Sequence, residues 1–253
     1  MQQLGSTRSV HERDHILQTP DTFVYAPLPG MHRATAAVHV SPAAGADFVQ
    51  YTAVFEEGGR LGAAVGSRFL YVLEGDLHLV IKGNNEVTLW PGSYAYLPPG
   101  TQHEVTSLST VARVEVIEKS YVAGADLPAP RIVVGHEQDV VSTALGGDEE
   151  LQVRMLLPAD ESYDFAVNTM EYQPGASLSM VEMHVMEHGL LMLEGGGIYR
   201  LGDKWYPVTK GDFIWMAPYC PQWFGALGKA PAKYLIYKDW NRHPLSARVE
   251  AAR

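Results

Sequence analysis

Four side chains in the second half of the chain have the types and the spacing of a metal site: Glu182, His184, His188 and, further along, Gln222. Two imidazoles, a carboxylate and an amide oxygen form a nitrogen and oxygen donor set without thiolate, which favours Mn²⁺ or Fe²⁺ over a structural zinc ion. A divalent ion in such a site can orient a small substrate and lower the pKa of a water molecule. The pattern therefore predicts metal-dependent chemistry on a small molecule.

The spacing of these residues favours an extended backbone. Residues at even separations along a strand project to the same face, so Glu182, His184 and His188 would all point into one β-barrel. On a helix, Glu182 and His184 would lie about 200° apart and could not share an ion. We therefore expect this segment to be one strand, with Met183 and Val185 on its other face.

The chain contains an internal repeat with an offset of about 120 residues. Its copies are residues 73–75 with 91–103 and residues 193–195 with 210–222. Each copy has Leu-Glu-Gly, a strand-like run, and a stretch rich in glycine, proline and aromatic residues. Self-similarity of this kind predicts two copies of one structural unit in tandem.

Only the second copy has a full set of metal donors. Gln222 stands at the same interval from Gly211 as His103 does from Gly92, so Gln222 occupies the place of His103. At the places of the other three donors, the first copy has Gly62, Ala64 and Arg68. We therefore expect a metal site in the second half and a scaffold in the first, where His103 is structural rather than a ligand.

Short alternating runs between turn residues predict an all-β protein. In the run 76–83, every second residue is apolar, and Gly83-Asn84-Asn85 supplies a turn. Many short strands of this kind indicate a sandwich or a barrel. We predict two tandem barrels, an N-terminal one over residues 1–125 with a leading arm and a C-terminal one over 126–253. The joint would lie near 123–130, and the best helix candidate is short, at 138–144.

Composition narrows the class of protein. A chain of 253 residues suits two domains, and a net charge of -10 disfavours nucleic acid or an anionic membrane as a partner. A single cysteine excludes an intramolecular disulfide and fits a reducing compartment. The chain starts without a signal-peptide pattern, and no apolar run approaches the roughly 18 residues that span a bilayer. We expect a cytoplasmic protein that acts on a small molecule.

The residues leave other interpretations open. The polar side chains could be satisfied core groups of a non-catalytic binding or storage protein. His184 to His188 also matches H-x-x-E-H, the inverted zinc-peptidase motif, in which Glu187 would be the base and residues 176–188 would form a helix. An iron-dependent oxygenase or a sugar-acid isomerase could use the same ion.

The repeat also resembles the cupin pattern, H-x-H-x(3,4)-E-x(6)-G followed by G-x(5)-P-x-G-x(2)-H. The first copy retains the second motif intact, as Gly92, Pro98, Gly100 and His103. The second copy retains metal-capable groups at all four ligand places with altered identities. The resemblance implies two double-stranded β-helix (jelly-roll) cupin barrels, a bicupin.

Longer stretches resemble the (S)-ureidoglycine aminohydrolase family. They are residues 182–208, 211–218, 221–224, 234–239 and 241–242, with Arg13-Asp14-His15 and Pro27-Leu28-Pro29-Gly30 near the N-terminus. The resemblance implies a Mn²⁺-dependent bicupin of purine (allantoin) catabolism that assembles as a homo-oligomer. Such enzymes hydrolyse (S)-ureidoglycine to (S)-ureidoglycolate and ammonia.

The resemblance also implies residue roles. The metal ligands would be Glu182, His184, His188 and Gln222, and the substrate contacts would include Tyr199, Tyr234 and Lys238. We expect the Lys238 ammonium to hold the substrate carboxylate. Glu182 would contact the substrate amine as well as the ion, and Gln222 would also line the substrate site. Tyr199, Tyr234 or Lys238 could deliver a proton to the departing amine.

Bland interpretations of these residues also remain. Lys238 is in phase with Tyr234 and Ile236, which favours an inward side chain, but a solvated strand lysine is the alternative. Tyr199 could simply be a core residue. We expect Cys220 to pack rather than to react, because no base is apparent near it in the sequence.

Overall fold

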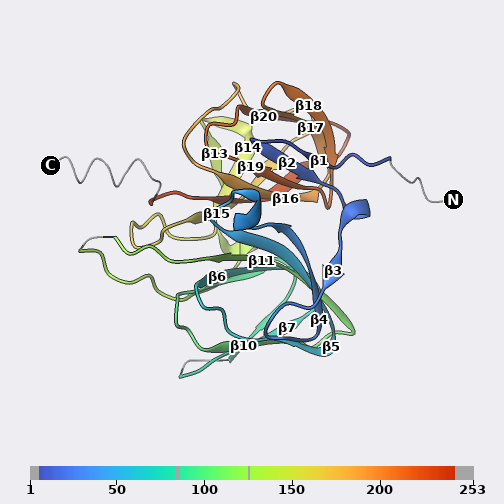
Figure 1. The fold of residues 1–253 in the computed structure, drawn as a ribbon. Helices are drawn as coiled ribbons and strands as arrows, with labels where there is room; N and C mark the ends of the chain where they lie inside the picture. The colour runs from blue at the N-terminus through green and yellow to red at the C-terminus, as the bar shows by residue number, and fades with distance from the viewer. Residues whose placement is uncertain (1–5, 84–85, 125, 243–253) are drawn as a thin grey trace. The chain divides into compact units, whose positions relative to one another are not determined.

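The computed structural model of the protein describes residues 6–83, 86–124 and 126–242 (Figure 1). The chain forms two units. Within the described residues, the first barrel consists of those between 24 and 139, and the second barrel consists of 6–23 together with 140–242. Among the described residues, the helices are single 3₁₀ turns, at Pro20–Thr22, Pro42–Ala44 and Glu137–Asp139. The predicted all-β class is confirmed.

The first barrel is one sheet that folds over on itself. Its order is β12-β9-β6-β11-β5-β10-β7-β8, with β4 beside β5 and β3 beside β4. The long strand β5 joins the two layers, because it pairs with β11 along most of its length and with β10 at its end. The strands are β3 (Tyr25–Ala26), β4 (Met31–Val40), β5 (Val49–Leu61), β6 (Ser67–Glu74), β7 (Leu77–Ile81), β8 (Glu86–Leu89), β9 (Ser93–Leu97), β10 (His103–Ser107), β11 (Val111–Lys119) and β12 (Val133–His136).

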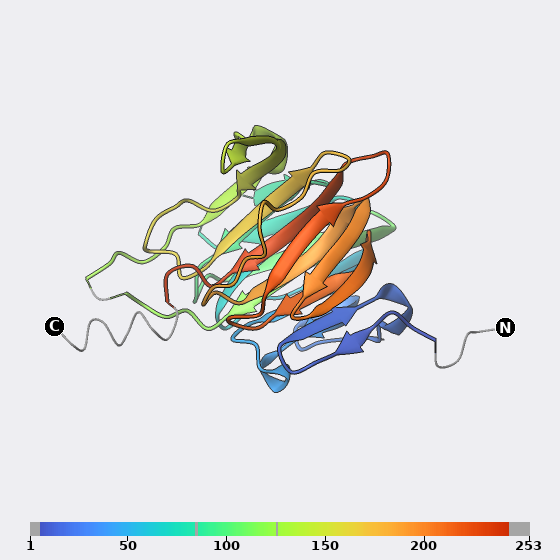
Figure 2. The same ribbon diagram turned by 90° about the horizontal axis from the view of Figure 1, so that it is seen from above.

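The second barrel has an eight-stranded sheet, β1-β2-β19-β16-β21-β15-β14-β13, and a three-stranded sheet, β18-β17-β20. Figure 2 shows its strands from above. They are β1 (Val10–His11), β2 (His15–Gln18), β13 (Thr143–Leu145), β14 (Asp148–Met155), β15 (Ala166–Tyr172), β16 (His188–Glu194), β17 (Gly196–Leu201), β18 (Lys204–Thr209), β19 (Phe213–Met216), β20 (Gln222–Ala226) and β21 (Ala232–Lys238). Its core lies between the two sheets and includes Tyr172, Met192, Tyr199 and Phe224.

The repeated Leu-Glu-Gly motif ends the corresponding strands β6 and β16 in a tight turn. Gly75 has φ 72° and Gly195 has φ 61°, a left-handed conformation that favours glycine. A Cβ at either position would also lie within 2.5 Å of a backbone carbonyl oxygen, that of Val111 or Pro231. Both copies therefore need glycine here for conformation and for space.

The two barrels differ in two segments from the predicted division of the chain between residues 125 and 126. Strand β2 pairs with β19, which places the N-terminal residues in the second barrel rather than in a leading arm of the first. Strand β12 pairs with β9, so residues beyond 125 belong to the first barrel. Both pairings join segments far apart in the sequence, so strand pattern alone does not reveal them. The helix predicted at 138–144 is wrong, since a 3₁₀ turn ends at Asp139 and β13 begins at Thr143.

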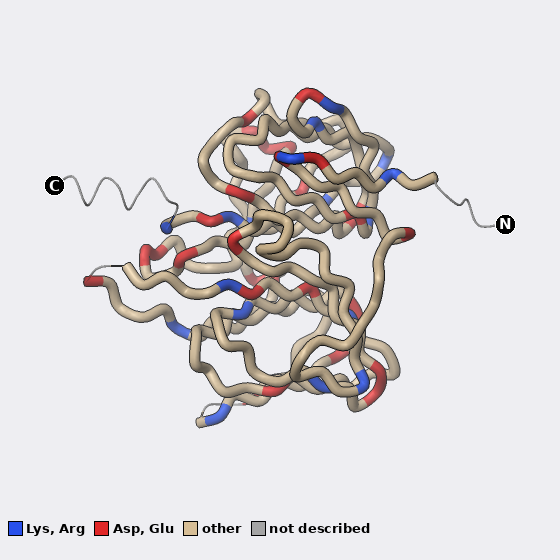
Figure 3. The backbone as a smooth tube through the Cα atoms, viewed as in Figure 1, with Lys and Arg blue, Asp and Glu red and all other residues tan. Residues whose placement is uncertain are grey.

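Charged positions are interspersed along both units, with no concentrated basic segment among those described (Figure 3). Within the same described ranges, no helix has the length and apolarity needed to carry the chain across a bilayer.

Candidate metal and active site

A pocket of about 140 Å³ lies within the second barrel. All seven residues that the sequence singled out for metal or substrate line it. The lining residues are Leu145, Met170, Leu178, Glu182, His184, Met186, His188, Tyr199, Gln222, Tyr234, Ile236 and Lys238. The pocket is small beside the roughly 300–1,000 Å³ of sites for drug-sized ligands, and it therefore suits a compact polar molecule.

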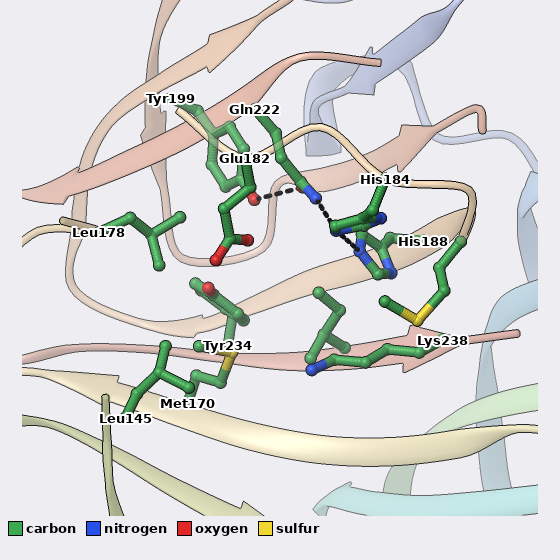
Figure 4. Close-up of a pocket in the computed structure, with 12 residues that line it drawn as sticks. Leu145, Met170, Leu178, Glu182, His184, His188, Tyr199, Gln222, Tyr234 and Lys238 are labelled. Carbon is green, nitrogen blue, oxygen red and sulfur yellow. Dashed lines mark hydrogen bonds between the residues drawn. The ribbon is translucent and has the colours of Figure 1, made fainter. Parts of the chain in front are cut away.

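Three nitrogen-bearing side chains meet in this pocket (Figure 4). The Nε2 atoms of His184 and His188 are 3.3 Å apart, and His184 Nε2 is 2.9 Å from the Gln222 amide nitrogen. His188 donates its Nδ1 proton to the Tyr237 carbonyl oxygen at 3.1 Å, so its Nε2 carries the free lone pair. Separations near 3 Å are those between neighbouring ligands bonded at about 2.0–2.2 Å to one ion. The arrangement fits a divalent cation.

Burial favours the ligand form of both histidines. Desolvation lowers the pKa of His188 well below its ordinary value, and the nearby Lys238 charge lowers it further. Desolvation also lowers the pKa of His184. Both imidazoles are therefore held neutral, which is the form that coordinates a metal.

Gln222 and Glu182 are held together by their backbones. Each donates its backbone N–H to the other's carbonyl oxygen, at 2.8 and 2.9 Å. The Gln222 amide nitrogen faces His184, and a half-turn of the amide would present the oxygen as a ligand. The Glu182 carboxylate lines the same pocket but is turned toward Tyr234 rather than toward the imidazoles (Figure 4). The structure thus brings three of the four predicted ligands together and leaves the carboxylate apart from them.

The prediction that one strand carries Glu182, His184 and His188 is wrong. His188 begins β16, residues 183–187 lie outside any strand, and Glu182 forms an isolated bridge with Gln222. The intervening loop is held by the Tyr219 backbone N–H, which donates to the His184 carbonyl oxygen at 2.7 Å. A curled loop, rather than strand alternation, brings these side chains to one pocket.

The peptidase interpretation is also wrong. Glu187 is buried outside the pocket, where its carboxylate accepts a hydrogen bond from Trp215 Nε1 at 3.1 Å. Its backbone N–H donates to the Asp239 carboxylate at 2.7 Å. Residues 176–188 form no helix. A peptidase base must face the ion, and Glu187 faces away from the two histidines.

Lys238 and two tyrosines form the remaining polar surface of the pocket. Lys238 ends β21 directly beside His188 on β16, and burial lowers the pKa of its ammonium while the Glu182 charge opposes this shift. Burial raises the pKa of Tyr199 and of Tyr234 well above the ordinary value, so both hydroxyls stay protonated. Tyr199 directs its hydroxyl at the Gln222 amide oxygen, 3.5 Å away. One cation and two neutral hydroxyl donors therefore face the cavity.

Sequence reasoning missed two residues behind this surface. The hydroxyl of Tyr172 lies 2.6 Å from that of Tyr234. With its amide oriented to satisfy both hydrogen bonds, Asn168 accepts from Lys238 Nζ at 3.3 Å and donates to the Val167 carbonyl. Both residues are on β15 at an even spacing, and this spacing is the feature of the sequence that could have placed them on one face of a strand. Their partners depend on the β15–β21 pairing, which the local pattern does not reveal.

Both ring nitrogens of His103 in the first barrel are hydrogen-bonded. Arg68 Nη1 donates to His103 Nε2 at 2.8 Å, and His103 Nδ1 donates to the Thr101 carbonyl at 2.8 Å. The same guanidinium donates to Glu118 Oε1 from Nε at 2.9 Å and from Nη2 at 2.7 Å. Burial lowers the pKa of His103 to about 4, so the ring is neutral.

Comparison with known proteins gives consistent relatives. The family model of the cupin domain matches residues 56–118 and 168–237. An Arabidopsis thaliana protein named (S)-ureidoglycine aminohydrolase is 43% identical over 243 residues, covering 95% of this chain and 80% of the relative. An Escherichia coli (strain K12) protein of the same name is 30% identical over 245 residues, covering 94% of this chain and 93% of the relative. The crystal structure of protein YlbA from E. coli is similar with a TM-score of 0.84 and 28% identity, over 94% of this chain and 96% of that one.

Proposed function

The chain belongs to the (S)-ureidoglycine aminohydrolase family, and from this membership we propose that it hydrolyses (S)-ureidoglycine to (S)-ureidoglycolate and ammonia with Mn²⁺ in the pocket of the second barrel. Like its relatives, the chain is a hydrolase that acts on C–N bonds. One observation carries the proposal. His184, His188 and Gln222 meet in a small pocket that also contains Glu182 and Lys238.

The donor set supports a hard or borderline divalent ion. His184, His188, Gln222 and Glu182 would hold it, with no thiolate among the residues lining the pocket. When bound, the ion would supply Lewis acidity and a water of lowered pKa. The neutral imidazoles and the directed lone pair of His188 are already suited to that role.

The substrate needs a holder for its carboxylate, and Lys238 is suited to the task. Its ammonium lies in the pocket, with the Asn168 amide oxygen placed to accept one of its protons. A compact cation of this kind pairs with a carboxylate as a point charge. In a partly desolvated pocket that pair is stronger than it would be in water. Lys238 would therefore fix the carboxylate while Glu182 faces the amine on the same carbon.

The departing amine needs a proton to leave as ammonia. Burial lowers the pKa of Lys238 but raises those of Tyr199 and Tyr234, so Lys238 gives up a proton most readily of the three. The tyrosine hydroxyls would act as hydrogen-bond donors that orient the substrate. Tyr172, at 2.6 Å from the Tyr234 hydroxyl, would hold that donor in place.

The family resemblance also leads us to propose a role in purine (allantoin) catabolism and assembly as a homo-oligomer. Mass photometry of the purified protein tests the assembly, since a homo-oligomer should have a mass two or more times that of the 27.8 kDa chain. A monomer at working concentration would contradict this part of the proposal.

The decisive experiment is ammonia release from freshly generated (S)-ureidoglycine. We expect the metal-depleted protein to be inactive, and Mn²⁺ to restore release of ammonia together with (S)-ureidoglycolate of one handedness. An oxygen electrode run in parallel should stay flat. Oxygen consumption, or no ammonia at any metal loading, would overturn the hydrolase assignment in favour of another cupin reaction.

A further inference from the structure

The second barrel contains another group of potential metal donors, outside the pocket. The carboxylate of Asp14, a ring nitrogen of His15 and the thiol of Cys220 all lie within 4.8 Å of one another. Asp14 and His15 lie at the start of β2, and Cys220 lies in the loop between β19 and β20. Sequence reasoning did not anticipate this group, because Asp14 and His15 are about 200 positions from Cys220 along the chain.

His15 is held in a definite orientation. Its Nε2 lies 2.9 Å from the Tyr206 hydroxyl, and its Nδ1 lies 2.9 Å from Asp14 Oδ1. The ring is 2% exposed and packs edge-on against Tyr206. A hydrogen bond at one ring nitrogen that orients the other toward a ligand group is typical of histidines that bind metals.

The group also has an open side. The Asp14 side chain is 46% exposed, whereas His15 and Cys220 are buried. Gly202 borders the group, and a Cβ there would lie 3.2 Å from Asp14 Oδ2 and 4.0 Å from His15 Nδ1. A side chain at this position would crowd the carboxylate, and Gly202 also has φ 61°, which favours glycine.

We propose that Asp14, His15 and Cys220 bind a zinc-class divalent ion at a second metal site, with solvent at the fourth position. Thiolate, imidazole and carboxylate together form a donor set that zinc prefers, unlike the nitrogen and oxygen set of the pocket. The thiol proton passes to water when the ion binds. This site does not depend on the hydrolase assignment.

The ion would brace the loop that supports the pocket. Tyr219, which precedes Cys220, has φ 64°, a left-handed conformation that is uncommon for a bulky residue. Its backbone N–H donates to His184, and Gln222 follows two residues after Cys220. An ion at Cys220 would therefore fix the loop that places both of these pocket residues.

Cobalt substitution tests the site without any activity assay. The chain has one cysteine, so any thiolate-to-cobalt charge-transfer absorption in the near ultraviolet must come from Cys220. We expect the full-length protein, freed of metal and titrated with Co²⁺, to develop this band to about one equivalent per chain. Zn²⁺ should then abolish the band by displacement, because zinc has no partly filled d shell.

Matched variants identify the partners of Cys220. Asp14→Asn and His15→Gln should each weaken cobalt binding, measured by this band, at least about tenfold. His188→Gln, which alters only the pocket, should leave the band and its affinity unchanged. Asp14→Asn changes a half-exposed residue and should fold normally, so it remains informative if His15→Gln does not fold.

Two outcomes would overturn the proposal. One is the absence of a charge-transfer band in the wild-type protein at more than two equivalents of Co²⁺ per chain, which is enough to fill the pocket as well. The other is a band whose affinity is the same in Asp14→Asn and in the wild-type protein, which would show that Cys220 binds cobalt without Asp14.

Discussion

The two barrels have different ionisable side chains at equivalent positions of their strands. In the first barrel, Arg68 on β6 lies directly beside Glu118 on β11. In the second, the corresponding strands β16 and β21 place His188 beside Lys238. The position on β6 or β16 thus holds a guanidinium in the first barrel and an imidazole in the second. The position beside it, on β11 or β21, holds a carboxylate in the first barrel and an ammonium in the second.

The first barrel pairs the charges at this place with one another. The Arg68 guanidinium contacts His103, the Gly62 carbonyl and Glu118, and the Tyr51 hydroxyl donates to Glu118 at 2.7 Å. A cation and a carboxylate are therefore both built into the chain at this place. On the proposed function, the second barrel would receive these two partners from outside, as a metal ion and as the substrate carboxylate.

The surrounding side chains follow the same contrast. When the corresponding strands of the two barrels are compared, Leu79 in the first barrel occupies the position of Tyr199 in the second. Val114 likewise occupies the position of Tyr234. In the first barrel these positions are apolar core, and in the second they carry hydroxyls that face the pocket. On the proposed function, the comparison teaches that one fold would serve as scaffold or as reaction site according to whether its central charges are paired internally.

The largest expected effect is the loss of a pocket imidazole. His188→Ala, like Glu182→Ala, should abolish metal binding in the pocket and reduce kcat/KM at least about 1,000-fold, because ion and water activation disappear together. Metal analysis and ammonia release measure both losses. His103→Ala in the first barrel is the control and should leave substantial activity, and an equal loss there would show that the first barrel is not a scaffold.

Removal of the pocket cation should come next. Lys238→Met should lower kcat/KM by at least about 100-fold. KM should rise because a charge-assisted contact to the carboxylate contributes about 1.5–3 kcal/mol, and kcat should fall because the proposed proton donor is lost. Lys233→Met is a matched control on the same strand, since Lys233 pairs with Glu194 outside the pocket. Steady-state kinetics measure both variants. An equal loss of kcat/KM in Lys233→Met and Lys238→Met would contradict the role assigned to Lys238.

The internal ion pair can be broken in the first barrel. Arg68→Met leaves the Glu118 carboxylate without its cation and should reduce the free energy of unfolding by about 3 kcal/mol. Arg68→Met combined with Glu118→Gln should recover much of that loss, because neither charge then remains. Denaturant unfolding of the single and double variants measures the difference. If the double variant were no more stable than the single one, the pair would not be the source of the effect.

Stability should also depend on pH through His103. Burial lowers its pKa in the folded protein to about 4, below the unfolded value of about 6.5, so the unfolded chain binds more protons between these values. Stability should therefore rise with pH from about 4 to about 6.5, and be lost as pH falls through this window, by a few kcal/mol at most. Unfolding of His103→Gln across the same window should show a flatter profile, and an unchanged slope would exclude His103 as its origin.

The smallest expected effect is at the support of Tyr234. Tyr172→Phe removes a buried hydrogen bond and should lower kcat by several-fold with little change in metal content, since about 1 kcal/mol corresponds to a factor near five. Single-turnover kinetics measure the change. A loss of metal in this variant would show instead that Tyr172 acts on the ion site.

Much of this architecture could be predicted from the sequence. The repeat and the alternating runs predicted two β-barrels, and the shared interval from glycine predicted that Gln222 would lie near the histidines. The phase of Lys238 with Tyr234 and Ile236 predicted an inward lysine, and all three line the pocket. These inferences rest on periodicity within a strand, which the sequence displays directly.

Contacts between distant strands could not be predicted in the same way. The pairing of Arg68 with Glu118 and the place of Asn168 beside Lys238 depend on which strands become neighbours. The loop through His184 follows a path that no alternation describes. Each is a property of tertiary pairing, for which a single sequence has no local marker.

The pairing of β2 with β19 also determines when the second barrel can be completed during synthesis. Residues 15–18 leave the ribosome almost 200 residues before their partners, residues 213–216. At about 5–20 residues per second, the first strand waits roughly 10 to 40 s for its neighbour. The first barrel, whose residues are contiguous, can fold within that interval, so the two halves of the repeat would fold in sequence, with the half that contains the pocket last.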